Sequence, residues 1–337
     1  MWFRRIGQAL GLLACVFLLA SLVLFCAVKL VPGDPVALRL KNPDPVRVEA
    51  IRESLGLNDP LPVQYGRYLV NFLRGSWGNS LITGQSVVGQ MREFFPATLE
   101  LALAALLLGV SAGIAAALGA QWLRWGVLGR VSSGFGALGL TVPIFWLGLM
   151  LIVTGSYWLG WFPAGGRFDF AREMPRGTGF LTLDCLLAGR PDHFLVACRY
   201  LTLPVCCLSL YPAALVSGVL FARFEDPRLL ALVRALRAKG LPPSRIWLKH
   251  VLRLLGAPVV TVVGTNFGAL LGGAVLTETV FSWPGMGRYL VEAVLNRDLF
   301  VVENGLLLVI LMAFTVVALS DLVALLVNPQ ARYSTQR

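Results

Sequence analysis

Charged residues and histidine are scarce in this chain, and the motifs of several enzyme classes are missing. Only 14% of the 337 residues are charged, and only 2 are histidine. The sequence contains no Gly-x-x-x-x-Gly-Lys-Ser/Thr loop that could cradle nucleotide phosphates, and no His-Glu-x-x-His pair for zinc. It also contains no Cys-x-x-Cys. We therefore expect no catalytic site, no bound cofactor and no metal site in this chain.

Long apolar runs dominate the sequence instead. Apolar residues make up 57% of the chain and the mean hydropathy is +0.73, which is typical of a protein that crosses a membrane several times. A helix needs about 20 apolar residues to cross roughly 30 Å of hydrocarbon. Runs of that length cover residues 9–31, 97–123, 133–158, 200–223, 256–281 and 302–327.

The positions of lysine and arginine orient these runs, because basic residues favour the cytoplasmic side. With the N-terminus inside, basic residues gather at both chain ends, after the second run and between the fourth and fifth runs. The net charge of +11 then lies on one face of the membrane. This distribution predicts six spans with both termini cytoplasmic, and it explains the basic balance without any binding of nucleic acid.

Two features near cysteines leave alternatives open. Leu12-Leu-Ala-Cys15 is similar to a lipoprotein cleavage site, but the apolar run continues to Val28. That length exceeds a signal-peptide core, so an uncleaved first span is favoured. Cys185 and Cys198 fall on the external side of the predicted topology, and the sequence does not fix whether they form a disulfide.

Residues 226–254, here called the basic segment, predict two short helices joined by a tight break. Asp226 can cap the first helix, Gly240 can end it in the left-handed conformation, and Ser244 can cap the second. Apolar residues share one face of the first helix, and basic residues recur every four positions on the second: Leu229, Leu232, Val233, Leu236; Arg245, Lys249, Arg253. The segment either lies on anionic lipid or docks a cytoplasmic partner.

Small residues at four-residue spacing predict close helix packing in two of the runs. One row comprises Ala105, Gly109, Gly113 and Ala117; the other comprises Gly264, Gly268 and Gly272. The second row packs either on another helix of this chain or on a second subunit.

A re-entrant turn is predicted after the fifth run, where Pro284, Gly285 and Gly287 oppose a regular helix. Pro143 is likewise expected to kink the third run. Glu278 lies near the outer end of the fifth run, where an acid is costly unless it is paired or hydrated. Arg288 is one partner that the sequence offers, and a structural pair at the turn is favoured over contact with substrate.

Five stretches match the pattern of one family. They are Pro32-Gly-Asp-Pro35, Leu55-Gly-Leu-Asn-Asp-Pro-Leu-Pro-Val-Gln-Tyr-Gly66, Pro96-Ala-Thr-Leu-Glu-Leu-Ala102, Leu276-Thr-Glu-Thr-Val-Phe-Ser-Trp-Pro-Gly-Met-Gly-Arg288 and Arg234-Ala-Leu-Arg-Ala-Lys-Gly240 with His250-Val-Leu-Arg253 after it. In this order and spacing the chain resembles the ABC importer permeases of the dipeptide/oligopeptide/nickel family, first permease subunit. It departs from that pattern at Leu236, usually Ala, at Leu254, usually Asn, and at Gln330, usually basic.

The resemblance implies a fold and its divisions. We expect an all-α membrane protein with six transmembrane helices, both termini cytoplasmic, the type I ABC importer permease fold and a small external subdomain. The expected divisions are a first transmembrane helix (1–31), the external subdomain (32–96), a five-helix core (97–327) with an external loop (160–198) and coupling helices (226–254), and a cytoplasmic tail (328–337).

The resemblance also implies a function and partners. We expect a permease subunit that moves di- or oligopeptides from an external binding protein across the bacterial inner membrane. A second homologous permease and two ATPase subunits, which hold ATP and magnesium, would complete the assembly within the lipid. An importer of nickel or of a metal chelate is the alternative within the family. An ion-coupled secondary transporter is the alternative outside it, with only Glu278 and Asp321 as buried acids.

The resemblance further implies two sets of functional residues. Those expected to couple to the ATPases are Arg234, Ala235, Arg237, Ala238, Lys239, Gly240, Arg245, Lys249, His250 and Arg253. Those expected to line the translocation path or its gate are Asn266, Gly268, Gly272, Glu278, Trp283, Pro284, Gly285 and Arg288.

Overall fold

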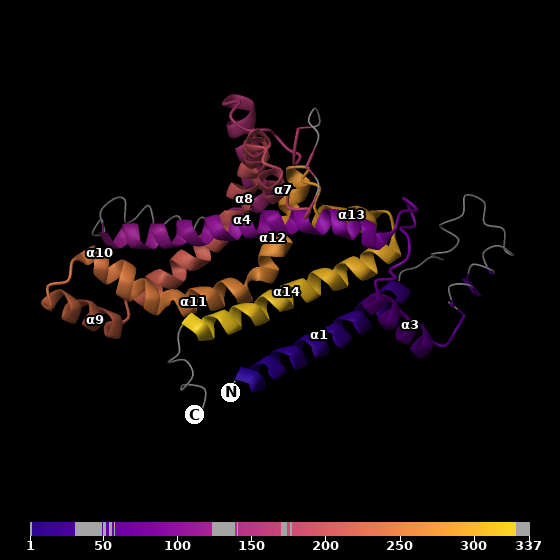
Figure 1. The fold of residues 1–337 in the computed structure, drawn as a ribbon, viewed down its shortest axis with the longest axis horizontal. Coiled ribbons are helices and arrows are strands. Elements are labelled where there is room, and N and C mark those ends of the chain that lie inside the picture. The colour runs from indigo at the N-terminus through magenta and orange to yellow at the C-terminus, as the bar shows by residue number, and fades with distance from the viewer. Residues whose placement is uncertain are drawn as a thin grey trace. The chain divides into compact units, whose positions relative to one another are not determined.

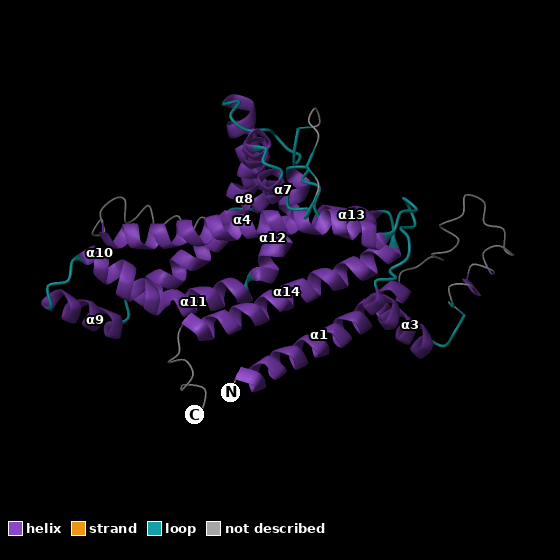
Figure 2. Ribbon diagram, in the orientation of Figure 1, coloured by secondary structure: helices purple, strands orange, loops and turns teal. Residues whose placement is uncertain are grey.

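The computed structural model describes residues 2–30, 49, 52–53, 56, 58–122, 139, 141–169, 174–175 and 177–327. The Pro32–Pro35 motif and the tail with Gln330 lie outside the described residues. Across the described ranges the chain is helical, and its one β-type pairing is an isolated bridge between Asn79 and Ser86 (Figure 2). The chain divides into two compact units, Met1–Pro96 with Gly285–Phe314 and Ala97–Pro284 with Thr315–Arg337.

The first unit contains α1 (Trp2–Leu30), α3 (Leu61–Arg74), the start of α4 (Val87–Trp122), α13 (Met286–Leu295) and the start of α14 (Leu299–Val327). Helix α3 ends at Gly75 in the left-handed conformation, φ 72°. The apolar core joins α4, α13 and α14 through buried Val87, Met91, Leu290 and Val301.

Three hydrogen bonds of side chains hold the loop before α4 and the start of α4 in the first unit. The Ser80 hydroxyl and the Leu81 N–H both donate to the buried Asp298 carboxylate. The Tyr289 hydroxyl donates to the Gln90 side-chain oxygen. Because Asp298 directly precedes α14, the loop before α4 is tied to the start of that helix.

The second unit contains the rest of α4 and α14 together with the helices between residues 144 and 280. These are α6 (Ile144–Leu151), η2 (Ile152–Trp158), α7 (Leu181–Leu187), α8 (Pro191–Phe224), α9 (Pro227–Ala238), α10 (Pro243–Arg245), η3 (Ile246–Val251), α11 (Leu252–Thr265) and α12 (Phe267–Val280), most of them labelled in Figure 1. η2 and η3 are π-helical turns that continue α6 and precede α11, respectively.

Close packing of α4 on α8 confirms the first row of small residues. A Cβ on Gly109 would lie 2.5 Å from Pro212 Cγ, and a Cβ on Gly113 would lie 2.7 Å from the Ala213 carbonyl oxygen. Neither position accepts a larger side chain without a shift of the α8 backbone. Ala105 and Ala117 of the same row are fully buried. The two helices therefore approach as closely as small residues allow.

In the part of the chain that the structure describes, five helices are long and apolar enough to cross a membrane, namely Leu10–Leu30, Val87–Ala120, Pro191–Phe224, Pro243–Thr265 and Leu299–Ala324. Ile144–Trp158 and Phe267–Val280 are shorter apolar helices. The expected run 256–281 is broken at Asn266, so it consists of α11 and α12 rather than one helix. Pro143 does not kink a helix; it precedes α6 as its N-cap residue, a position that suits a residue with fixed φ.

Candidate functional site

The basic segment begins with a capped helix, as the sequence predicts. The Asp226 carboxylate accepts a 2.9 Å hydrogen bond from the Arg228 N–H, and Pro227 is the first residue of α9. A side-chain acceptor at this place satisfies one of the backbone donors that have no partner within the helix. The cap separates α9 from α8, which ends at Phe224.

The break after α9 also follows the prediction at Gly240. This glycine adopts φ 77°, the left-handed region, and its N–H donates to the Arg237 carbonyl. Pro242 and Pro243 then start the next helical turn. The prediction that Ser244 caps it is wrong, because Ser244 lies inside α10 and Pro242 is the N-cap residue without a side-chain bond.

The inner face of the basic segment is apolar. Leu229 and Val233 of α9 are buried against Ile246, Trp247 and Val251 of η3, with Phe224 beneath them. The rings of Phe224 and Trp247 meet edge to face, with 5.0 Å between centroids. Of the predicted apolar face, Leu232 stays 38% exposed, whereas Leu236 packs partly buried on this cluster. Leu236, one of the residues that depart from the family pattern, therefore packs on the inner face of the basic segment.

The outer face presents the residues expected to couple to ATPases. All but one are exposed: Arg234, Ala235, Arg237, Ala238, Lys239, Gly240, Arg245, Lys249 and Arg253. His250 is half-buried in η3. The structure thus leaves these residues exposed on a hairpin whose interior is apolar. No pairing with an acidic side chain is seen there among the described residues.

The residues expected to line a path begin at the break between α11 and α12. The Tyr211 hydroxyl of α8 donates to the Asn266 amide oxygen at 3.2 Å, and the Asn266 amide donates to the Val262 carbonyl at 2.9 Å. Gly268 and Gly272 are exposed, and a Cβ at either place would meet nothing within 4 Å. Only Gly264 of this row packs on the chain itself, where a Cβ would clash with the Ser320 hydroxyl.

A tight turn follows α12, as expected. Ser282 adopts φ 49°, a conformation that a non-glycine residue holds only when its surroundings enforce it. Trp283 is 1% exposed, and its indole N–H donates to the Ala97 carbonyl at 3.1 Å. The Gly166 N–H donates to the Phe281 carbonyl at 2.8 Å. Pro284 is half-buried and Gly285 precedes α13. Gly287 does not break the helix, since it lies inside α13.

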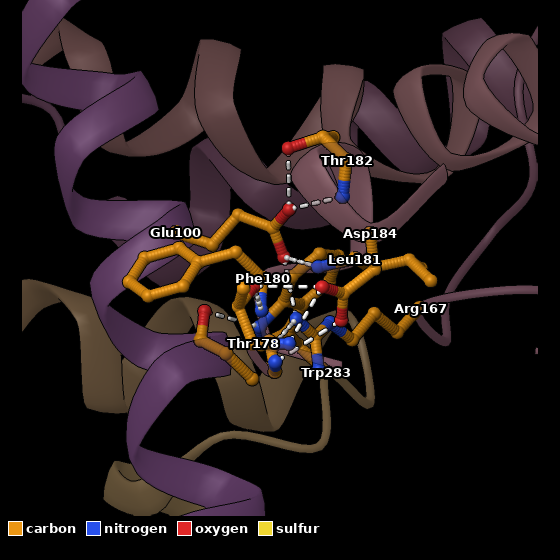
Figure 3. A network of polar contacts seen from close by, with 10 residues as sticks. Glu100, Arg167, Thr178, Phe180, Leu181, Thr182, Asp184 and Trp283 are labelled. Carbon is orange, nitrogen blue, oxygen red and sulfur yellow. Dashed lines mark hydrogen bonds and ion pairs between the residues drawn. The ribbon is translucent and has the colours of Figure 1, made fainter. Parts of the chain in front are cut away.

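A buried polar network surrounds the first turn of α4 in the second unit. It is defined here as Thr98, Glu100, Arg167, Thr182, Asp184, Glu278 and Trp283. Figure 3 shows Glu100, Arg167, Thr182, Asp184 and Trp283 of this network. Glu100 and Arg167 form an ion pair of 2.6 Å with side chains only 5% and 9% exposed. Glu100 also accepts from the Leu181 N–H and from the Thr182 N–H and hydroxyl. The Arg167 guanidinium lies 5.7 Å from the centre of the Trp283 ring.

Glu278 has a partner on the same turn of α4. The Thr98 hydroxyl donates to the Glu278 carboxylate at 2.6 Å, and Glu278 is fully buried. Arg288, the partner that the sequence offered, belongs to the other compact unit, where it pairs with Glu292 at 2.9 Å. α4 therefore contacts the end of α12 through Thr98, and the turn beyond it through Ala97.

Asp184 organises the loop that carries Arg167. Its carboxylate accepts from the Thr178 N–H and hydroxyl, each at 2.7 Å, and from the Gly179 N–H at 3.0 Å. Burial alone raises the pKa of Asp184, but these hydrogen bonds and the nearby Arg167 charge outweigh it and hold the pKa below the ordinary value. Asp184 is thus an anion that caps the turn before α7.

Sequence reasoning missed Thr98, Glu100, Arg167 and Asp184. A weak signal existed, because Glu100 interrupts an apolar run that should exclude an acid unless it is paired. The partner could not be found, since Arg167 lies 67 positions away. The cysteines expected beside this loop, Cys185 and Cys198, carry free thiols in the structure. The described residues contain no group of three or more metal-ligating side chains.

Several helices long and apolar enough to cross a membrane, together with the outward basic face of the hairpin, define a multi-span membrane protein. Two family models match the chain. One, described as the binding-protein-dependent transport system inner membrane component, matches residues 105–333, and one for the N-terminal part of such components matches residues 2–102. The chain belongs to this family, whose members are multi-pass proteins of the bacterial inner membrane.

Named relatives match almost the whole chain. A protein of Pseudomonas aeruginosa named di/tripeptide transport system permease protein DppB is 40% identical over 331 residues, 97% of this chain and 98% of the relative. The dipeptide transport system permease protein DppB of Escherichia coli is 35% identical over 336 residues, 97% of this chain and 98% of the relative. A probable D,D-dipeptide transport system permease protein DdpB of the same species is 39% identical over 314 residues, 91% of each chain.

Proposed function

We propose that this chain is the permease subunit of an ATP-driven importer of dipeptides and short oligopeptides. The observation that carries the proposal is the match to permeases named for dipeptide transport along 97% of the chain. The two family models, over residues 2–102 and 105–333, together include the basic segment and the buried polar network.

The proposed topology has six spans and cytoplasmic termini. The helix pairs α6–η2 and α11–α12 each form one span, which with α1, α4, α8 and α14 gives six. The basic segment then faces the cytoplasm, as the rule for basic residues demands. The loop that contains α7 and Arg167 faces outward. The residues from 32 to 96 form the external subdomain, and residues 328–337 the cytoplasmic tail.

The proposed assembly contains a second homologous permease, two ATPases and an external binding protein. ATP and magnesium bind to the ATPases, whereas this chain supplies the exposed face of the basic segment as their docking surface. The exposed Gly268 and Gly272 support a path or a contact with the second permease, because no described residue of this chain covers them.

The geometry supports a mechanical coupling. α9 is packed on η3, and η3 continues without a break into α11, which leads to Asn266 in the span. A displacement of the hairpin by the ATPases therefore moves the lower half of the fifth span directly. At the other end, Glu278, Trp283 and Pro284 form the proposed outer gate. The protein alternates between outward and inward openings as the ATPases close and separate.

Uptake by proteoliposomes tests this function. Both permeases, both ATPases and the binding protein are reconstituted with a radiolabelled dipeptide outside and ATP inside. We expect uptake that requires ATP and the ATPases and that unlabelled dipeptide abolishes. Competition by a nickel chelate instead of a dipeptide would assign a metal-chelate importer. Uptake without any ATPase would contradict the proposal in favour of an ion-coupled transporter.

A further inference from the structure

The turn between α12 and α13 is held in a strained conformation from two directions. Ser282 lies in the left-handed region, which costs on the order of 1–3 kcal/mol in general and survives only under constraint. On one side the Ala97 carbonyl accepts from Trp283, and on the other the Gly166 N–H donates to Phe281. A Cβ on Gly165 would lie 2.4 Å from the Phe281 carbonyl oxygen, so the loop and the turn touch backbone to backbone.

Arg167 stands at the junction of these constraints. It follows directly on Gly165 and Gly166, its guanidinium pairs with Glu100 of α4, and it lies against the Trp283 ring. The same Nη2 also donates to the Gly179 carbonyl at 2.6 Å. One side chain therefore links α4, the loop and the turn.

Glu100 does not need Arg167 as a hydrogen-bond donor. Its carboxylate already accepts from the N–H groups of Leu181 and Thr182 and from the Thr182 hydroxyl. Arg167, by contrast, is nine-tenths buried, and its Nε–H has no partner among the described residues. A buried donor without a partner is expensive, and a neutral apolar side chain of similar length would avoid that cost. Replacing both partners of a buried ion pair by neutral side chains of similar volume is often neutral or stabilising, so fold stability alone gives a weak reason for the Glu100–Arg167 pair at this place.

We propose that Arg167 is a positioning residue that holds the turn Phe281–Trp283 in its closed conformation and releases it when the loop is displaced from outside. This inference rests on the proposed function, because it assigns the turn to the outer gate of the path. A load on the loop acts together on Gly165, Gly166 and Arg167, which all contact the turn. The ATPases then sense the release through α12 and α11.

The test measures ATP hydrolysis by the assembled complex without the binding protein. Arg167→Met should raise this basal rate roughly tenfold, within the usual range of coupling between distant sites, and should lower peptide uptake per ATP hydrolysed. Arg167→Lys keeps the charge beside Glu100 and should return the basal rate most of the way to wild type. Arg199→Met is the matched control, since Arg199 is an exposed arginine on α8 that donates to the Trp161 carbonyl; it should leave the basal rate unchanged.

A second variant distinguishes loss of the Arg167 contact from misfolding of the protein. Arg167→Met leaves Glu100 without a counter-charge, whereas Glu100→Gln with Arg167→Met leaves no unpaired buried charge. The double variant should assemble and still show the raised basal rate. An assembled double variant with the wild-type basal rate and wild-type coupling would overturn the inference. A wild-type complex that hydrolyses ATP but imports no dipeptide would refute the proposed function alone, because the basal rates still decide the role of Arg167.

Discussion

The basic segment exposes its charged side chains, whereas the buried polar network encloses its own. The basic segment turns charges of one sign outward and buries only apolar side chains between α9 and η3. The network buries both signs together, with Glu100 and Arg167 at 5% and 9% exposure. A surface of one sign, held on a rigid apolar base, suits a partner that docks and leaves. Paired charges in the interior suit a contact that must be made or broken as a whole.

The largest expected effect is a difference in unfolding free energy between one substitution in each of the two regions. Glu100→Ala removes one partner of a buried ion pair and leaves Arg167 uncompensated, which should cost about 3–5 kcal/mol of unfolding free energy. Arg245→Ala, in the exposed stripe of the basic segment, should change it by no more than about 0.5 kcal/mol. Thermal unfolding of the purified protein in detergent checks both. Equal effects of the two substitutions would remove the contrast between the regions.

The substitution Gly240→Val tests the role of the basic segment in transport. Valine is strained at φ 77° by on the order of 1–3 kcal/mol, so the break between α9 and α10 should shift and ATP-driven uptake should be lost, although the protein still reaches the membrane. Gly84→Val is the matched control, because Gly84 has φ 70° with nothing within 4 Å of its Cβ position. Normal uptake with valine at 240, or equal loss in the control, would count against the coupling role.

Loss of the α9 cap should have a smaller and local effect. Asp226→Ala removes the acceptor for the Arg228 N–H, which should cost about 1 kcal/mol. The buried polar network lies elsewhere, so its backbone amides should remain protected from hydrogen exchange. Hydrogen exchange followed by mass spectrometry should show faster exchange in residues 227–238 and unchanged exchange in residues 97–102. Faster exchange in both would show that the two regions are not independent.

The smallest expected effect is on the stability of the folded protein at acidic pH. The pKa of Asp184 in the folded protein lies below the ordinary value of 3.8. A lowered folded pKa adds stability that is complete above the unfolded pKa and disappears as the pH falls through the folded value. Wild type should therefore keep this contribution between pH 7 and 5 and lose it below about pH 4. Asp184→Asn should be less stable at pH 7 and less sensitive to acid below pH 4, as thermal unfolding at each pH would show. An identical acid profile would contradict the assignment.

The same contrast explains what the sequence could predict. The basic segment is a local structure, because its cap, its left-handed glycine and its apolar spacing act within a few residues. Asp226 and Gly240 were predicted correctly for that reason. Ser244 was not, since two preceding prolines already start the helix and bring Ser244 inside it. The apolar pattern does not predict the break at Asn266, because the side chains on both sides of this residue are apolar or small.

The buried polar network is a long-range structure and could not be predicted. Thr98 and Glu278 lie 180 positions apart, and Glu100 and Arg167 lie 67 apart. Only the folded chain shows that one turn of α4 contacts both the end of α12 and the loop before α7. Arg288 was a reasonable partner for Glu278 by proximity in the sequence, but the structure gives Glu278 the Thr98 hydroxyl.

The central claim is that the exposed face of the basic segment is held by an ATPase, and a photo-crosslinking amino acid at position 235 tests it most directly. Ala235 is exposed on α9, whereas Leu107, 70% exposed on the spanning helix α4, serves as the comparison site. In membranes that contain the complete transporter, the account predicts a crosslink from position 235 to an ATPase and none from position 107. Capture of lipid alone at position 235 would contradict it.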